Sequence, residues 1–223
     1  MKILVKFPTF NRPKQFYNTL YEYYKKANNK NDMHFLISID ECDVSMNTET
    51  VLNGLKSYPN LEVVIGDSKS KIDAVNRDLE KTEYKWDILL LASDDMVPME
   101  KGYDDIIRND MKEYFSDLDG VLWYNDGHQK DALNTLCILG KKYYERFNYI
   151  YYPEYKSGYC DNEFTKVSKI LNKVKYFDRV IIEHQHPDWG YGQNDIIHSN
   201  NYKNLSFDKN LFVNREKNNF YIN

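Results

Sequence analysis

The first half of the chain alternates short apolar runs with segments whose apolar residues recur at helical spacing. The apolar runs cover residues 2–7, 33–40, 61–66 and 86–92 and predict buried strands. Helices are predicted around 47–57 and on three further sets of residues: Phe16, Leu20, Tyr23 and Ala27; Ile72, Val75 and Leu79; and Tyr103, Ile106, Ile107, Met111 and Tyr114. Strands that alternate with helices indicate an α/β protein with a mainly parallel sheet flanked by helices.

The second half is less regular. Strands are expected at 120–124 and 135–140, and residues 174–187 form either a strand pair or one long strand. Together they suggest a smaller mixed sheet. Helices are expected at 141–147 and 160–171, and a loop with a loosely attached tail from Asp188 onward. We therefore expect one domain over 1–223, with a regular half at 1–115, a less regular half at 116–187 and a flexible loop and tail at 188–223.

Composition narrows the class of protein. The chain has 223 residues, 42% hydrophobic and 29% charged, which suits a folded domain. A net charge of −4 offers no basic surface for nucleic acid. No apolar run reaches the roughly 20 residues of a membrane span. The three cysteines show no paired spacing, and Pro8 interrupts the apolar start too early for a signal peptide. These features predict a cytoplasmic protein.

Acidic residues follow the ends of several predicted strands. Asp40, Asp67, Asp94 and Asp95 occupy such positions. Parallel sheets bind ligands at the carboxyl ends of their strands, so we expect these acids to share one rim. The adjacent pair Asp94–Asp95 has two interpretations. It forms a solvated acidic turn ahead of Pro98, or it faces a divalent cation such as Mg²⁺ or Mn²⁺.

Two later motifs also have two interpretations each. His184 and His186 would project to the same face of a strand and could join a metal site, or they could mark a polar strand end. Asp161 precedes a helical pattern, where it is either a helix N-cap or a general base.

The first turn, "FPTFNRP" (7–13), contains no glycine. Both the dinucleotide fingerprint and the P-loop need glycines where the backbone approaches phosphate closely. A nucleotide bound here would therefore be held by side chains and a metal ion.

Taken in order, the motifs resemble those of a known family. They are "FPTFNRP" (7–13), Asp40, "GDSKSKIDAVN" (66–76), "ASDDM" (92–96), "CDNEF" (160–164) and "HQHP" (184–187). The chain resembles GT-A glycosyltransferases of the inverting, family-2-like type, and in particular small single-domain enzymes of bacteria and phages. The likeness covers residues 2–187. It implies that residues 1–115 are the nucleotide-binding half and that residues 116–187 are the acceptor and catalytic half.

The resemblance implies transfer of a sugar, of the hexosyltransferase type, from a nucleotide-sugar donor to a glycan or other hydroxyl acceptor. It also implies a divalent cation, Mn²⁺ or Mg²⁺. Asp95 would bind the metal with His184, His186 or both, and Asp161 would be the base, with Glu163 as the contender. The donor would be held by Pro8, Thr9, Phe10, Arg12, Asp40, Gly66, Lys71, Asn76 and Asp94.

Three positions depart from the family pattern. Ser93 replaces the first acid of the metal motif, so that Asp94 takes an outer role. Val75 replaces an arginine, which leaves Lys71 or Arg77 as phosphate partners. The base motif reads Asp161-Asn162-Glu163, so that Asp161 is the expected base and Glu163 the contender. Ser93 and Val75 keep open a non-catalytic or decayed sugar-nucleotide-binding protein. A metal-dependent phosphoesterase is less favoured, because no D-x-H or G-N-H motif supplies a two-metal cage.

Aromatic residues suggest two further features. The stretch from Tyr149 to Tyr159, with Trp123 and Tyr124, is either an acceptor platform or half-buried packing. Residues 186–195 carry Trp189 and Tyr191 between glycines, which predicts a lid over the donor. The alternative is a surface loop with Trp189 packed permanently on the domain.

Overall fold

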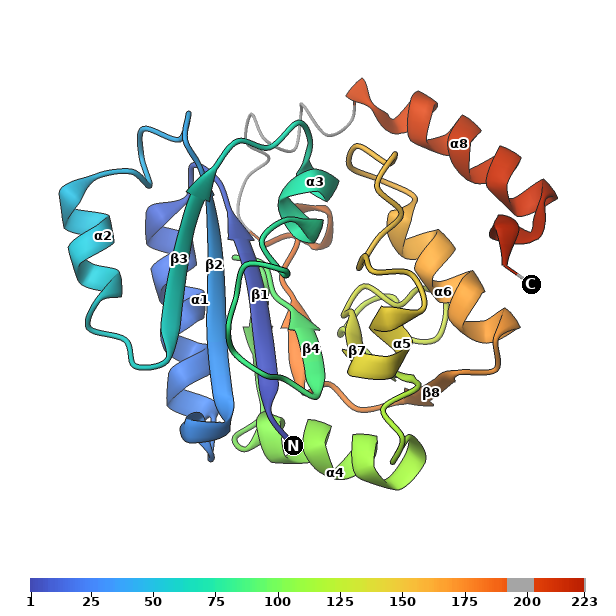
Figure 1. Ribbon diagram of the computed structural model, residues 1–223, viewed down its shortest axis with the longest axis horizontal. Helices are drawn as coiled ribbons and strands as arrows, with labels where there is room; N and C mark the ends of the chain where they lie inside the picture. The colour runs from blue at the N-terminus through green and yellow to red at the C-terminus, as the bar shows by residue number, and fades with distance from the viewer. Residues whose placement is uncertain (192–202, 223) are drawn as a thin grey trace.

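The computed structural model describes residues 1–191 and 203–222, and its described strands form two sheets (Figure 1). Seven strands form the larger sheet in the order β3-β2-β1-β4-β7-β6-β8, and among them β7 alone runs antiparallel to its neighbours. They are β1 (Ile3–Thr9), β2 (Met33–Asp40), β3 (Leu61–Gly66), β4 (Ile88–Leu91), β6 (Val121–Tyr124), β7 (Ile138–Gly140) and β8 (Val174–Phe177). The predicted mainly parallel sheet is confirmed. The smaller sheet pairs β5 (Met96–Pro98) with β9 (Ile182–His184) in antiparallel register.

Helices cover both faces of the larger sheet (Figure 1). One face carries α1 (Pro13–Lys26), α2 (Glu49–Leu55) and α4 (Tyr103–Tyr114). The other carries α3 (Lys71–Asn76), α5 (Lys141–Glu145), α6 (Cys160–Ile170) and α8 (Leu205–Lys217). Single 3₁₀ turns lie at Lys30–Asp32, Pro187–Trp189 and Asn219–Tyr221. Successive residues of a strand point to opposite faces, so Ile3 and Val5 pack in one core cluster and Leu4 in the other.

The segment 174–187 is neither one long strand nor a strand pair. β8 lies at the edge of the large sheet beside β6, whereas β9 pairs with β5. Between them the chain is fixed by the amide of Asn125, which donates to Asp178 at 2.8 Å. As a result, the end of β9 lies beside the turn that contains Asp94 and Asp95. The Gln185 N–H, directly after β9, donates to Asp95 O at 2.7 Å.

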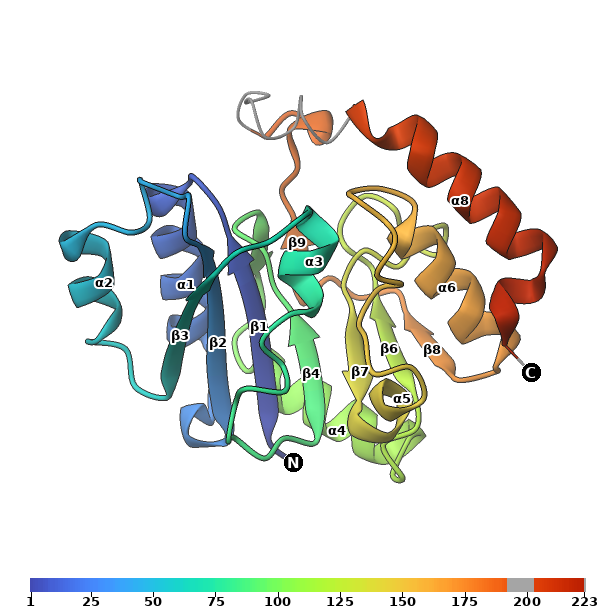
Figure 2. The ribbon, with the colours of Figure 1, turned by 45° about the horizontal axis from the view of Figure 1, so that its top comes forward.

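The expected loop and loosely attached tail is wrong for residues 205–217, which form α8 alongside α6 (Figures 1 and 2). Buried acids hold the helix in place. The Asp208 carboxylate accepts from the backbone N–H groups of Lys156, Ser157 and Gly158 at 2.8–2.9 Å. The Arg215 guanidinium donates to both carboxylate oxygens of Glu163, at 2.8 and 2.9 Å. The sequence pattern does not predict this helix, because it has no wide apolar face. Hydrogen bonds and an ion pair to distant parts of the chain hold it in place.

We expect Arg215→Met to lower the free energy of unfolding by about 3–5 kcal/mol, because it leaves the buried Glu163 carboxylate unpaired. The two side chains are only 7% and 6% exposed. Urea unfolding measures the loss. Glu216→Gln is the matched control, since its pair with Lys166 is exposed (39% and 49%) and should change stability by less than about 1 kcal/mol. Equal losses in both variants would contradict a buried clamp.

Within residues 1–191 and 203–222, no helix combines the length and apolar character that crossing a membrane requires.

Candidate functional site

Polar residues from both halves of the chain meet at the carboxyl ends of the central parallel strands, the upper edge of the sheet in Figure 2. Thr9 ends β1, Asp40 ends β2, and Asp94 and Asp95 follow β4. The end of β9 joins this edge through its pairing with β5. The predicted rim of acids is therefore formed by strands that lie next to one another.

The paired acids of the rim face different partners. The Asp94 carboxylate lies 3.3 Å from Arg12 Nη1, and its backbone carbonyl accepts from Thr19 Oγ1 at 2.6 Å. The Asp95 carboxylate accepts from the Ser93 hydroxyl and lies 3.5 Å from His184 Nε2. Ser93, the residue that departs from the family pattern, thus orients Asp95.

The two carboxyl groups differ in their affinity for protons. Burial, reinforced by the negative charge of Asp95, raises the pKa of Asp94 in spite of Arg12. Burial acts in the same direction on Asp95, but hydrogen bonding and charge from His184, together with Ser93, outweigh it and lower the pKa of Asp95. Asp95 is therefore the member of the pair that holds its negative charge most firmly.

His184 stands between two acids, the second of which the sequence reasoning missed. Asp126 accepts from His184 N through its backbone carbonyl at 2.9 Å, and its carboxylate lies 4.0 Å from His184 Nδ1. That carboxylate is fixed by Thr135 Oγ1 at 2.6 Å and by two backbone N–H groups of the following loop. A signal existed, because Asp126 follows β6, whose carboxyl end lies at the same rim.

Asp95 and His184 fit one side of a divalent-cation site. Among the described residues, no group of three or more His, Cys, Asp and Glu side chains can hold a metal ion. An oxygen and a nitrogen donor nevertheless suit Mn²⁺, and Mg²⁺ in nucleotide sites commonly takes substrate phosphates and water as its other ligands. The carboxylate of the second acid, Asp126, lies 4.0 Å from Nδ1, on the side of the ring where histidine ligands usually have their second partner.

His186 does not extend the strand face on which it was predicted. β9 ends at His184, and His186 N donates to His184 O at 2.9 Å, which makes a turn. The two imidazole rings lie 5.5 Å apart between centroids, at 70° to each other.

Asp161 is the second residue of α6, and its N-cap interpretation is wrong. The N-cap residue is Tyr159, with a φ of 60° and no side-chain cap. The Asp161 carboxylate accepts from Asn162 N at 2.9 Å. Burial raises the pKa of Asp161, while the charges of Lys71 and His184 act against the rise. The effect of His184 on this pKa indicates that Asp161 lies within electrostatic range of the Asp95–His184 pair.

Glu163, the contender for the base, is engaged elsewhere. Both of its oxygens accept from Arg215, and the Tyr155 hydroxyl donates to it at 2.8 Å. It serves the α6–α8 contact.

Two residues predicted to bind the nucleotide-sugar donor lie in α3, and their surroundings differ. Lys71 is exposed at the first position of the helix, directly after the Ser70 cap. Its side chain hydrogen-bonds to none of the described residues. Asn76 holds the aromatic loop: its Oδ1 accepts from Ile150 N and Tyr151 N, and its Nδ2 donates to Tyr151 O at 2.7 Å.

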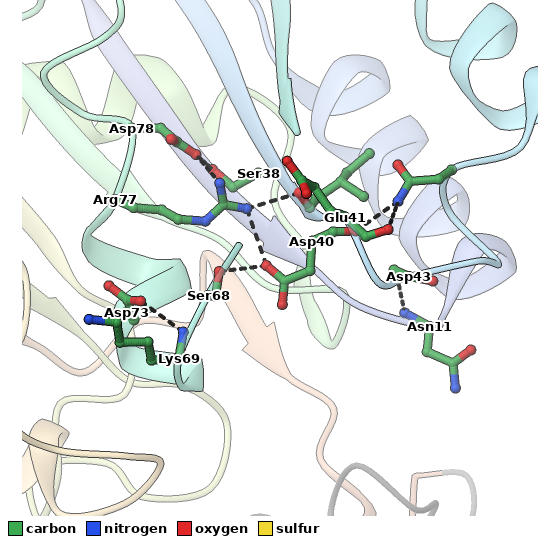
Figure 3. A network of polar contacts seen from close by, with 12 residues as sticks. Asn11, Ser38, Asp40, Glu41, Asp43, Ser68, Lys69, Asp73, Arg77 and Asp78 are labelled. Atoms are coloured by element: carbon green, nitrogen blue, oxygen red, sulfur yellow. Dashed lines mark hydrogen bonds and ion pairs between the residues drawn. The ribbon is translucent and has the colours of Figure 1, made fainter. Parts of the chain in front are cut away.

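The loop after β1 also reaches the rim. Thr9 Oγ1 is buried and has no hydrogen-bond partner among the described residues. A buried hydroxyl without a partner is costly, so this oxygen is well placed for a bound ligand. Pro8 lies within β1, and Phe10 beside Thr9 is exposed. Asn11, with a φ of 58°, donates its backbone N–H to buried Asp43 (Figure 3).

Of the two interpretations of the aromatic residues, packing applies to Trp123, Tyr124, Tyr151 and Tyr155, whereas Tyr149, Tyr152 and Tyr159 are half-buried. The first four are all buried in the core. Trp189, three residues after His186 in the chain, is 43% exposed, and its ring stacks on that of His128 with 5.0 Å between centroids. Residues 192–195 of the predicted lid lie outside the described residues, so the lid stays a prediction.

The fold is shared with solved glycosyltransferases. S. aureus TarS (1–349) is 17% identical with a TM-score of 0.64, and the match covers 82% of this chain and 60% of that one. The same fragment in complex with UDP-GlcNAc gives 17% identity and a TM-score of 0.65, over 82% and 58% of the two chains. Mannosyltransferase PcManGT from Pyrobaculum calidifontis, in complex with GDP-Man and Mn²⁺, is 12% identical with a TM-score of 0.66, over 85% and 58%.

These likenesses establish the fold. The chain has a GT-A type of α/β fold, as its motifs predict. It spans about three fifths of the length of TarS (1–349) and of PcManGT. No protein-family model and no curated protein sequence matches it.

Proposed function

We propose that this protein is a metal-dependent glycosyltransferase that moves a sugar, of the hexose type, from a nucleotide-sugar donor to an acceptor hydroxyl with inversion. One observation carries the proposal. Asp95 from the first half of the chain and His184 from the second form a pair at the rim of a glycosyltransferase-type sheet, and Asp161 lies within electrostatic range of His184. The fold of the neighbours supports sugar transfer, and the complex of PcManGT with Mn²⁺ supports the divalent cation.

The donor side of the reaction uses residues of the first half together with His184. Asp95 and His184 would hold Mn²⁺ or Mg²⁺, which supplies a positive charge against the diphosphate leaving group. Lys71, exposed at the start of α3, adds a second cation toward the same phosphates. Thr9 Oγ1 and Asp40 face the nucleoside, and Phe10 offers an exposed ring beside them.

The acceptor side uses Asp161. Its carboxylate takes the proton from the attacking hydroxyl, whose oxygen displaces the diphosphate at the anomeric carbon. A single in-line displacement of this kind inverts that carbon. Because burial raises the pKa of Asp161, the group is a stronger proton acceptor than an ordinary surface carboxylate. The acceptor is a glycan or another molecule with a free hydroxyl.

A thermal-shift panel followed by a turnover assay tests the function. UDP-GlcNAc, GDP-Man and further nucleotide sugars are each added with and without Mn²⁺. A true donor at one hundred times its Kd stabilises the native state by about 2.7 kcal/mol, and we expect this only with the metal present. Release of nucleoside diphosphate should follow. Binding without any release, even by hydrolysis, would identify a binding protein and contradict the enzyme.

A further inference from the structure

The loop that leads into α6 is held by α8, which lies alongside that helix (Figure 2). The buried Asp208 carboxylate accepts from the backbone N–H groups of three successive residues, Lys156, Ser157 and Gly158. Successive N–H groups that converge in this way form a nest for an anion, and here the anion is a side chain of α8. Gly158 also lets α8 approach closely, because a Cβ built on it would lie 2.7 Å from Leu205 Cδ2. The path of the chain just before α6 therefore depends on α8.

Tyr159, the next residue, has a backbone conformation that bulky residues rarely adopt. Its φ of 60° and ψ of −7° are left-handed, and it is the N-cap residue of α6 without a side-chain cap. Such a conformation persists only where the surroundings hold it. Asp208 fixes the backbone directly before Tyr159, and the Phe212 ring of α8 packs on the Tyr159 ring with 5.6 Å between centroids. The support for this strained residue thus comes from α8.

The conformation of Tyr159 decides where Asp161 lies. The first hydrogen bond within α6 runs from Glu163 N to Tyr159 O at 3.1 Å, so Tyr159 sets the direction of the turn that carries Asp161. The hydrogen bonds to the Asp161 carboxylate come from the backbone of that turn, namely from Asn162 N and from its own N–H. Among the described residues, no side chain from another element hydrogen-bonds to this carboxylate. Its place is therefore set by the backbone at the start of α6.

We propose that α8 positions the proton acceptor of the transfer reaction: Asp208 and Phe212 hold Tyr159 in its left-handed conformation, and the turn that follows places Asp161. The inference rests on the proposed function, because it takes Asp161 as the base. Asp208 and Phe212 are positioning residues that act through the backbone of α6. A displaced base loses rate steeply, since a misplacement of about 1 Å can cost on the order of a hundredfold.

The Asp208→Asn variant tests this role. The amide keeps the size of the side chain, but its amino group cannot accept from the N–H groups of the loop. We expect the kcat for release of nucleoside diphosphate to fall at least about tenfold, with UDP-GlcNAc or whichever member of the thermal-shift panel is turned over fastest. The Kd of the same nucleotide sugar with Mn²⁺ should be unchanged. Glu163 N–H should also exchange faster with solvent, because its acceptor is Tyr159 O.

Asp104→Asn is the matched control. Asp104 is also buried, and its carboxylate accepts from the backbone N–H groups of Asn28 and Asn29 at 2.9 Å. These two residues follow α1, at the edge of the sheet opposite the rim. The control should lower the melting temperature and leave kcat per folded molecule unchanged well below melting. Equal losses of kcat in the two variants, or an unchanged kcat in folded Asp208→Asn, would overturn the inference and leave the proposed function standing. Absence of turnover in the unmodified protein would overturn both.

Two replacements of Tyr159 test the conformation without removing a buried charge. Asn takes a positive φ readily, whereas a β-branched residue such as Val does not. Tyr159 is half-buried, so both variants should fold, and they carry the test if Asp208→Asn does not. Tyr159→Asn should keep at least about fivefold more of the kcat than Tyr159→Val. Equal losses in the two variants, or a change confined to the KM for the acceptor, would show that the ring itself contacts the acceptor and would overturn the positioning role.

Discussion

Replacing Asp161 by Asn should reduce sugar transfer at least about a hundredfold, within the range of about 10²–10⁴ that a positioned general base contributes. The amide keeps the shape of the side chain and cannot take the acceptor proton. Stability should be retained, because burial disfavours the charged form of Asp161 and Asp161 is not the N-cap residue of α6. Donor affinity should stay near that of the unmodified protein. Initial rates and donor titrations measure the two quantities separately.

Glu163→Gln serves as the matched control for this result. Glu163 lies two residues further along α6 but is bonded to Arg215 and Tyr155. Its replacement should lower the melting temperature and leave the rate per folded molecule nearly unchanged at temperatures well below melting. If Glu163→Gln abolishes transfer in folded protein and Asp161→Asn does not, the base is Glu163. The pH profile adds a check: the raised pKa of Asp161 means that transfer falls as the pH decreases, and at a higher pH than for an ordinary aspartate.

Replacing Asp95 by Asn should abolish the Mn²⁺-dependent part of donor binding. Asp95 is the acid whose pKa is lowered by His184 and Ser93, so it presents the firmest negative charge at the rim. The amide keeps the size of the side chain, and we expect a folded protein with a modestly lower melting temperature. Calorimetric titration of the donor with Mn²⁺ and with EDTA gives the metal-dependent difference directly.

Asp94→Asn provides the comparison, because it makes the same replacement of a carboxylate oxygen by an amide nitrogen at the neighbouring residue. Asp94 pairs with Arg12 and not with His184. Its replacement should weaken donor binding without removing the response to Mn²⁺. Loss of the metal response in Asp94→Asn, with its retention in Asp95→Asn, would reverse the two roles.

The arrangement of this pair explains how two adjacent like charges persist after a buried strand. The backbone turn after β4 sends one carboxylate to α1, where Arg12 meets it, and the other to β9, where His184 meets it. Each acid therefore has its own partner. Burial first, and then the negative charge of Asp95, raises the pKa of Asp94.

Local pattern in the sequence determined the parallel half of the fold and the acids at its rim. Consecutive apolar residues such as Ile88–Leu91 can be buried only in a strand covered on both faces, and polar residues after such strands must then share one edge. Asp40, Asp94 and Asp95 were found in this way. Asp126 obeys the same rule, but its strand belongs to the irregular half, where the direction of β6 was not evident.

Tertiary structure alone decided features that depend on partners distant in the chain. Helix α8 is held by Arg215 on Glu163 and by Asp208 on the loop at 156–158, and isolated polar residues give no periodic signal for such contacts. The aromatic residues Trp123 and Tyr124 read equally well as platform or core, because hydrophobicity does not specify which side of a strand is covered. Asp94 and Asp95 have different partners, and Arg77 donates to Asp40. These contacts too could be seen only in the folded structure. The charge state and the hydrogen bonds of a carboxylate depend on the groups that surround it in space. For Asp95, Asp94 and Asp40 these groups come from β9, the start of α1 and the end of α3, respectively.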